Sequence, residues 1–174
     1  AHLTTVELGH ATDTTLGRAA AGIMSVEGVP IINADHCAFK CSKNGDQALS
    51  TTGALTTITG WTEVYDQGSK FASNAWVPIA GRVALDALLT LTDDAACNVI
   101  LFIMKNLTTV VAAIELTTGT GGEAGYQSVL LHAEDDANGT DSYTLRYYTS
   151  SAGYTVRQDD SISGVPYLVS WFTG

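Results

Sequence analysis

A strict alternation of apolar and polar residues constrains the fold of this chain more than any other feature. The run RVALDALLTL, residues 82–91, places every second side chain on one face of an extended strand. These side chains are Val83, Leu85, Ala87, Leu89 and Leu91. The run SYTLRYYT, residues 142–149, alternates in the same way. Because the 3.6-residue period of a helix is almost absent, the alternation predicts β-strands.

A second kind of strand is predicted where apolar residues occupy both faces. The run NVILFIM, residues 98–104, is continuously apolar after its first residue. Such a strand must be covered on both sides. We expect one side to face the core and the other to face a neighbouring copy of the chain, so the run favours a homo-oligomer.

Turn residues separate these strands at short intervals. Typical turn sequences are Asp66-Gln67-Gly68, Thr92-Asp93-Asp94, Asn138-Gly139 and Ala152-Gly153. Short strands at this spacing predict an all-β, antiparallel sandwich or barrel. We expect the irregular stretch YDQGSKFASNAWVPIAG, residues 65–81, to form one strand pair of that sandwich.

The beginning of the chain differs from the rest. Residues 1–33 are short of apolar faces and repeat Thr and Ala, so they cannot build a core alone. We therefore expect a stem or attachment segment over 1–33 and a single globular head over 34–174.

Charge and composition exclude several classes of partner. The 174-residue chain has a net charge of −10, which disfavours binding to nucleic acid or to anionic lipid surfaces. Its apolar runs are far shorter than the roughly 20 residues of a membrane span, so no membrane insertion is expected. The three cysteines do not form the even-numbered framework of a disulfide-rich protein, and reduced thiols are expected at Cys37, Cys41 and Cys97.

Two parts of the sequence resemble known families. The segment GHATDTTLGRAAAGIMSVEGV, residues 9–29, resembles an element that precedes the distal domain of bacteriophage tail fibres. From Ala38 onward the chain resembles the globular heads of the complement first-component family, which are relatives of the tumour-necrosis-factor-like ligands. The motifs that carry this second resemblance are Ala38-Phe39, Tyr65-Asp66, Phe71, Pro78 with Gly81, QSVLLHAE (127–134) and a closing strand within 165–172.

The second resemblance implies a jelly-roll sandwich that assembles as a homotrimer. The closing stretch PYLVSWFTG departs from the usual terminal pattern of these heads, and Val83-Ala84-Leu85 replaces an aromatic pair.

One acidic segment is a candidate metal site. In EDDANGTD, residues 134–141, Glu134, Asp136 and Asn138 stand at alternate positions before a glycine, as in the opening of a calcium loop. Leu145 occupies the place of the final bidentate glutamate and excludes an EF-hand. A looser calcium site and a plain acidic turn both remain open, and no other cofactor is expected.

Aromatic residues beside turns are candidate ligand-binding residues. Trp61, Tyr126 and Tyr154 are the candidates for stacking against sugar rings, because aromatic rings present an apolar face with a polar tip. The alternative is that they lie in the core or in a subunit interface. Patterns typical of catalytic sites, such as G-x-S-x-G and H-E-x-x-H, are absent from the sequence, so an enzyme is not expected.

Together these features predict a trimeric head on a bacteriophage-like fibre or spike, at the outer face of the virion. The predicted partners are further copies of the chain, other virion proteins through residues 1–33, and a bacterial surface polysaccharide. The alternative is a purely structural capsid-fibre, decoration or baseplate component that binds no ligand.

Overall fold

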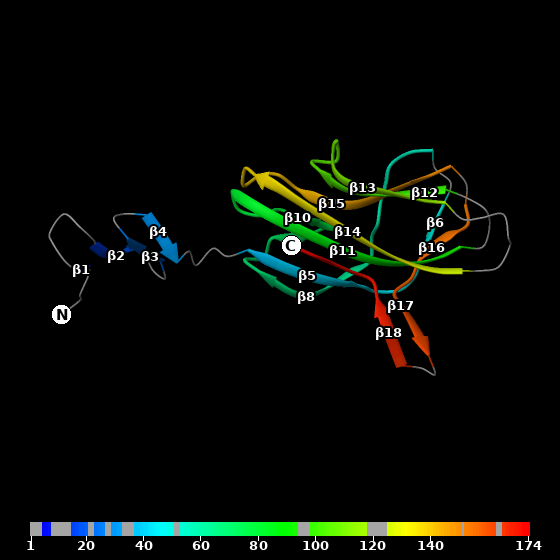
Figure 1. Ribbon diagram of the computed structural model, residues 1–174, viewed down its shortest axis with the longest axis horizontal. Coiled ribbons are helices and arrows are strands. Elements are labelled where there is room, and N and C mark those ends of the chain that lie inside the picture. The colour runs from blue at the N-terminus through cyan, green and yellow to red at the C-terminus, as the bar shows by residue number, and fades with distance from the viewer. Residues whose placement is uncertain are drawn as a thin grey trace. The chain divides into compact units, whose positions relative to one another are not determined.

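The computed structural model divides the chain into two compact units, residues 1–36 and 37–174 (Figure 1). The sequence analysis placed this division between residues 33 and 34. The structure describes the backbone of residues 5–7, 15–20, 23–26, 29–32, 37–50, 53–93, 98–117, 125–150, 152–162 and 165–174, and side chains within 37–50, 53–92, 98–117, 127–150, 152–158 and 169–174.

The first unit contains four described antiparallel strands in sequential order. These strands are β1 (Thr5–Glu7), β2 (Thr15–Ala20), β3 (Ile23–Val26) and β4 (Val29–Ile32). Each strand pairs with the next along the chain, so the unit is a meander built from local contacts.

The second unit is a sandwich of two antiparallel sheets, and no helix occurs in its described part (Figure 1). The described residues therefore include no helix long and apolar enough to cross a membrane. One sheet has the order β13-β12-β15-β10-β9, with β7 beside β15. The other has the order β6-β16-β11-β19-β5-β8, with β14 beside β11.

The bounds of the strands in the first of these sheets are β7 (Thr56–Thr57), β9 (Phe71–Ala72), β10 (Ala75–Trp76), β12 (Asn98–Lys105), β13 (Thr109–Thr117) and β15 (Tyr143–Thr149). Those in the second are β5 (Ala38–Lys43), β6 (Gln47–Leu49), β8 (Trp61–Gln67), β11 (Gly81–Asp93), β14 (Gly125–Ala137), β16 (Tyr154–Val156) and β19 (Trp171–Thr173). This is the all-β antiparallel jelly roll that the sequence predicts.

The alternation within β11 is confirmed by its burial. All five apolar residues predicted to share a face are buried in the core, and four of them have no exposed surface. Strand β14 pairs with β11 along its whole length and alternates in the same register. Burying one face of each strand fixes the register, because a shift by one residue would expose every core side chain.

Strand β12 has a core face and an outer face, as the run NVILFIM predicts. Val99, Leu101 and Ile103 are fully buried against the other sheet. Ile100 and Phe102 point the other way and are half-buried. The second apolar face of this strand therefore lies on the outside of the sandwich.

The end of the chain closes the second sheet. Strand β19 inserts between β11 and β5, and Gly174 exchanges backbone hydrogen bonds with Phe39. A Cβ atom at Gly174 would lie 2.6 Å from the Trp76 ring, so only glycine fits against this aromatic cluster. The predicted closing strand within 165–172 is thus divided into β18 (Val165–Val169) and β19.

The stretch of residues 65–81 crosses from one sheet to the other instead of forming a single strand pair. Strand β8 ends at Gln67, and the β9–β10 hairpin that follows belongs to the opposite sheet. The Asp66 carboxylate accepts hydrogen bonds from the backbone N–H groups of Lys70 and Phe71, at 2.9 and 2.8 Å. Gly68, with a φ of +91°, permits the tight turn between them.

Strands β17 (Asp159–Ile162) and β18 form a separate hairpin between β16 and β19. Ser170, which is fully buried, fixes the base of this hairpin. Its hydroxyl donates to the Arg157 carbonyl and accepts from the Thr90 N–H, at 2.7 and 2.9 Å. The hairpin therefore leaves the sheet from a rigid base on β11.

Candidate functional site

A network of charges joins strands β12, β14 and β15 at one end of the sandwich. The Lys105 ammonium lies 3.0 Å from a carboxylate oxygen of Asp135 and 3.0 Å from one of Asp141, and it donates to the Asp136 carbonyl at 2.8 Å. The Tyr143 hydroxyl donates to Asp135 at 2.8 Å. The ammonium thus occupies an oxygen-lined position of the kind that a metal cation would otherwise fill.

The electrostatics of this network keep all of its members in their usual charge states. The Asn106 amide, the Asn138 backbone N–H and the Lys105 ammonium hold the pKa of Asp141 below its ordinary value. Burial works against ionisation of Asp135, but the Tyr143 hydroxyl and Lys105 still lower its pKa. Hydrogen bonds to the two carboxylates raise the pKa of Lys105. The lowered pKa values of the two carboxylates and the raised pKa of Lys105 favour the charged forms of all three groups near neutral pH.

Two of the three residues of the predicted calcium site, Glu134 and Asn138, have other side-chain partners in this structure. The Glu134 carboxylate pairs with the Arg82 guanidinium at 2.6 Å, which lowers the pKa of Glu134. The Asn138 side-chain oxygen accepts three hydrogen bonds within its own turn, from Thr140 and Asp141. Asp136 is exposed. In the part of the chain that the structure describes, no group of three acidic, His or Cys side chains is placed to hold a metal ion.

The three predicted sugar-stacking residues fall in different environments. Tyr154 is 2% exposed and packs in the core, so its ring face is not available to a ligand. Trp61 is half-buried, tilted against Phe172, and donates from its indole N–H to the Ile58 carbonyl at 2.9 Å. The side chain of Tyr126 lies outside the described residues. The structure does not bring these three residues together.

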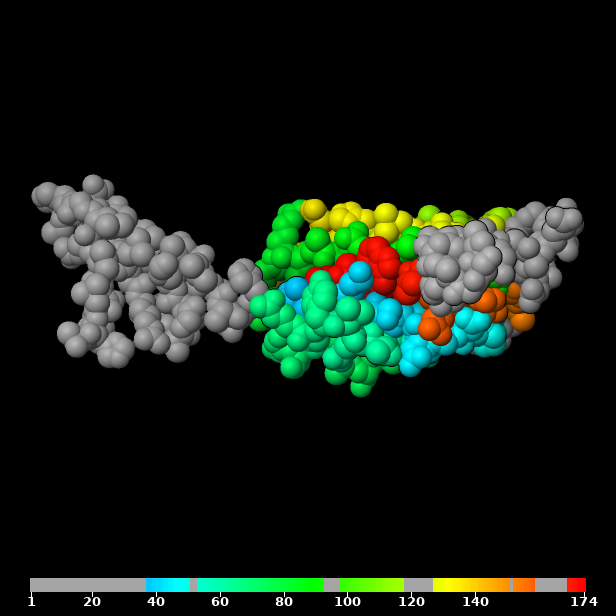
Figure 2. Space-filling model, turned by 90° about the horizontal axis from the view of Figure 1, so that it is seen from below, coloured from blue at the N-terminus to red at the C-terminus, as the bar shows by residue number. Residues whose placement is uncertain are grey.

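A more distinctive surface is the outer face of strands β14, β11, β19 and β5, which we call the β11 face. Figure 2 looks onto it, with β14 in yellow, β11 in green, β19 in red and β5 in blue. Leu130 of β14 lies opposite Leu88 of β11, which lies opposite Trp171 of β19. Leu130 is 59% exposed, and the other two side chains are half-buried. They form an apolar row across three neighbouring strands.

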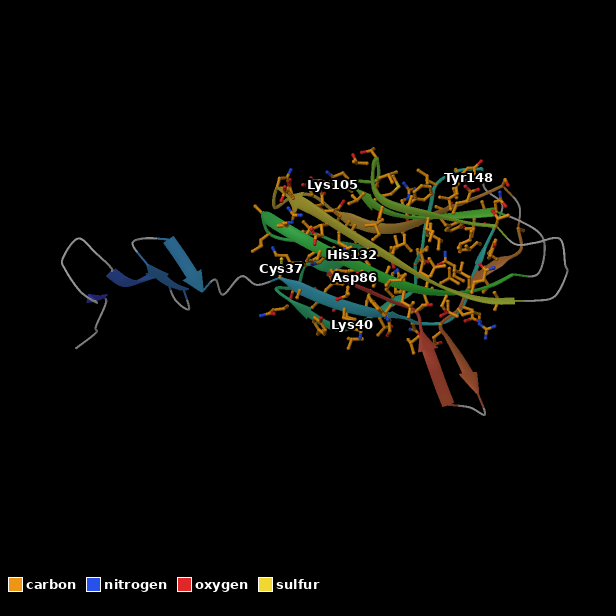
Figure 3. All side chains as sticks on the ribbon, in the orientation of Figure 1. Cys37, Lys40, Asp86, Lys105, His132 and Tyr148 are labelled. Atoms are coloured by element: carbon orange, nitrogen blue, oxygen red, sulfur yellow. The ribbon has the colours of Figure 1, made fainter. Side chains whose placement is uncertain are left out.

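Charged side chains flank this apolar row. His132 and Asp86 face each other from β14 and β11, with 2.8 Å between Nδ1 and the carboxylate (Figure 3). The Lys40 ammonium lies 5.7 Å from the centre of the Trp171 ring, a cation–π distance. Arg82 faces Glu134 and Asp136 at the end of β14. Each carboxylate that the structure describes on the β11 face has a cationic or imidazole neighbour.

Sequence reasoning missed the β11 face and the Lys105 network. The alternation of β11 places Asp86 outside the core, but it does not reveal that His132, 46 residues later in the chain, is its partner. Likewise, Lys105 and Asp141 meet only through the register of β12 with β15. Among the described residues, Cys37 and Cys41 are free cysteines.

Comparison with known proteins identifies the fold. No protein-family model matches the sequence, and neither does any curated protein. Among solved structures, the Eiger TNF of S. frugiperda aligns with a TM-score of 0.51 at 12% identity, covering 78% of this chain and 88% of that one. Murine APRIL aligns at 0.49 and 11% identity, covering 79% and 96%, and the globular domain of zebrafish complement 1qA at 0.43 and 11%, covering 79% and 93%. At these identities the likeness concerns the fold alone, and residues 37–174 adopt a jelly roll of the tumour-necrosis-factor type.

Proposed function

We propose that this chain is the self-assembling head of a bacteriophage-like fibre or spike. Three copies associate through the β11 face, and not through the outer face of β12, where the run NVILFIM led us to expect a neighbouring copy. Residues 1–33 attach the head to other virion proteins, and the trimer binds a bacterial surface polysaccharide. The head carries out attachment rather than catalysis, at the outer face of the virion. Trimerisation multiplies weak contacts with a surface, because three linked sites raise the effective concentration of each.

The observation that carries this proposal is the composition of the β11 face. An exposed leucine within an apolar row is costly in water, and its burial against another copy removes that cost. Copies of a chain with a net charge of −10 repel each other over most of their surface. The β11 face is suited to contact between copies because Arg82 pairs with Glu134, His132 shares a hydrogen bond with Asp86, and Lys40 adds a positive charge beside Trp171.

The experiment that tests assembly is the mass of the chain in solution, measured by light scattering with and without EDTA. A trimer of three 18.2 kDa chains is the expected result. The cation of the Lys105 network is an ammonium group and not a metal ion. We therefore expect EDTA to leave the trimer intact. A monomer at micromolar concentration would contradict the proposal.

A purely structural role, without any glycan ligand, is the second candidate. The burial of Tyr154 and the half-buried position of Trp61 favour it, because both residues were expected to contact sugar. An array of bacterial surface glycans separates the two functions. Saturable binding by the trimer supports attachment, whereas a trimer that binds none supports the structural role.

A further inference from the structure

The outer face of the opposite sheet carries an aromatic surface that the sequence analysis did not identify. Strands β15, β12 and β13 lie side by side there, and their register brings Tyr148, Ile100 and Glu115 into one row. In the next row Phe102 lies between Arg146 and Ala113. Tyr148 lies on the side of the sandwich away from Lys40 and the β11 face (Figure 3).

The apolar part of this surface is partly open. Tyr148, Ile100 and Phe102 all point outward from their strands and are half-buried. Adjacent strands are about 4.8 Å apart, so the three strands span roughly 10 Å. An exposed patch with aromatic rings can stack against the apolar face of a pyranose ring and leave the sugar hydroxyls free at its edge.

Polar groups stand at one edge of the patch. Asn98 and Glu115 are both exposed, and the Asn98 amide donates to the Glu115 carboxylate at 3.3 Å. No ion pair engages Glu115 among the described residues, so its carboxylate retains acceptor capacity toward a ligand. The pair thus offers an amide donor and a charged acceptor side by side, and an acetamido group carries the complementary N–H and C=O.

Arg146 fixes the opposite edge of the patch. Its guanidinium donates to the backbone carbonyls of Leu107 and Leu55 and has no carboxylate partner in the described part of the chain. These bonds hold the β12–β13 turn and the segment before β7 against the sheet. The aromatic patch therefore has one edge at which Arg146 bonds to backbone carbonyls and one edge at which the Asn98–Glu115 pair keeps hydrogen-bonding capacity.

We propose that this surface, which we call the Tyr148 platform, binds a glycan that contains N-acetylhexosamine. A pyranose ring stacks on Tyr148 and Ile100, and the acetamido group bonds to Glu115 and Asn98. The inference rests on the proposed attachment function and gives it a site and a ligand class. The platform and the β11 face lie on opposite sheets of the sandwich, so a trimer formed through the β11 face leaves the platform exposed.

Isothermal titration calorimetry with the full chain tests the platform, with a hexamer of β-1,4-linked N-acetylglucosamine as the probe. The matched variants are Tyr148→Ala and Tyr65→Ala, because Tyr65 is also an outward-facing tyrosine on a strand, 49% exposed, but lies on the other sheet. We expect Tyr148→Ala to weaken binding at least about tenfold and Tyr65→Ala to leave it unchanged. Cellohexaose, which lacks the acetamido groups, should bind more weakly than the probe, and Glu115→Gln should reduce that difference.

A negative result for the glycan site at the Tyr148 platform can be distinguished from a negative result for the proposed attachment function. If the probe does not bind, or binds equally well to the Tyr148→Ala trimer, the proposal that the Tyr148 platform binds this glycan is wrong. The glycan array then decides whether attachment itself stands, because it reports binding anywhere on the head. The mass of every variant is measured in the same buffer, so loss of binding through dissociation of the trimer is detected separately.

Discussion

At the scale of single residues, the ion pairs of Lys105 make the free energy of unfolding of the head depend on pH. The native pKa values of Asp135 and Asp141 lie below the ordinary value of about 3.9, so both carboxylates stabilise the fold at neutral pH. That contribution is lost as the pH falls through their native pKa values. We expect Lys105→Met to be less stable than the wild type at pH 7, because Asp141, with a side chain 5% exposed, loses its cation.

Urea unfolding at pH 7 and at pH 3 measures this effect. The difference between wild type and Lys105→Met should shrink at pH 3, where the carboxylates are becoming protonated. Lys70→Met serves as the control, since no ion pair of Lys70 occurs among the described residues. An equal difference at both pH values would show that Lys105 acts through packing alone.

Cys41 provides a second test at the residue scale. Its thiol is fully buried, and burial raises its pKa to about 12. Because the thiolate is the reactive form, Cys41 should resist iodoacetamide at pH 8 in the folded protein and react only after unfolding in urea. Peptide mass spectrometry of protein labelled before and after unfolding measures how much Cys41 has reacted. Rapid labelling in the native state would mean that β5 opens readily.

At the scale of elements, local patterns predict strands but not the partners of those strands. Period-two alternation identifies β11 and β15 because alternate side chains of each strand enter the core, and the turn at Asn138-Gly139 marks the end of β14. The insertion of β19 between β11 and β5 depends on contacts more than 80 residues apart, which no local pattern records.

Local sequence patterns could not predict the candidate site for the same reason. The Lys105 network and the Tyr148 platform are defined by register across strands, and Tyr148 differs from buried Tyr147 only in the face to which it points. Tyr154 was expected near the surface because Gly153 precedes it. Pairing with β11 and β6 instead turns its side chain into the core.

A substitution at Ser170 tests how much the base of the β17–β18 hairpin contributes to stability, because Ser170 anchors this hairpin to β11. Ser170→Ala removes the acceptor of the Thr90 N–H and the donor to the Arg157 carbonyl, all within a buried site. An unsatisfied buried N–H costs about 1–3 kcal/mol, and we expect the free energy of unfolding to fall by that amount. Ser142→Ala, which removes only an exposed 3.4 Å contact, should change it by less than about 0.5 kcal/mol. Equal effects of the two changes would show that the hairpin base contributes nothing.

At the scale of the whole molecule, the two outer faces of the sandwich differ in what they can do. The β11 face combines an apolar row with the Arg82–Glu134 ion pair and the His132–Asp86 hydrogen bond, which suits contact between identical copies. The outer face of β15, β12 and β13 has an aromatic patch with a polar edge, which suits a small ligand. Assembly through one sheet and recognition through the other would let a trimer present three separate platforms.

Leu130→Asp tests this division of roles. Leu130 is 59% exposed, so a charge there should cost the isolated chain little stability. In an interface between copies the same charge is buried without a partner, and we expect association to weaken at least about a hundredfold. The matched control is Val110→Asp on the opposite sheet, where the side chain is 50% exposed. Sedimentation should show Leu130→Asp as an 18.2 kDa monomer and Val110→Asp as a trimer. If Val110→Asp dissociates and Leu130→Asp does not, the copies meet through the opposite sheet, and the Tyr148 platform would lie in their interface.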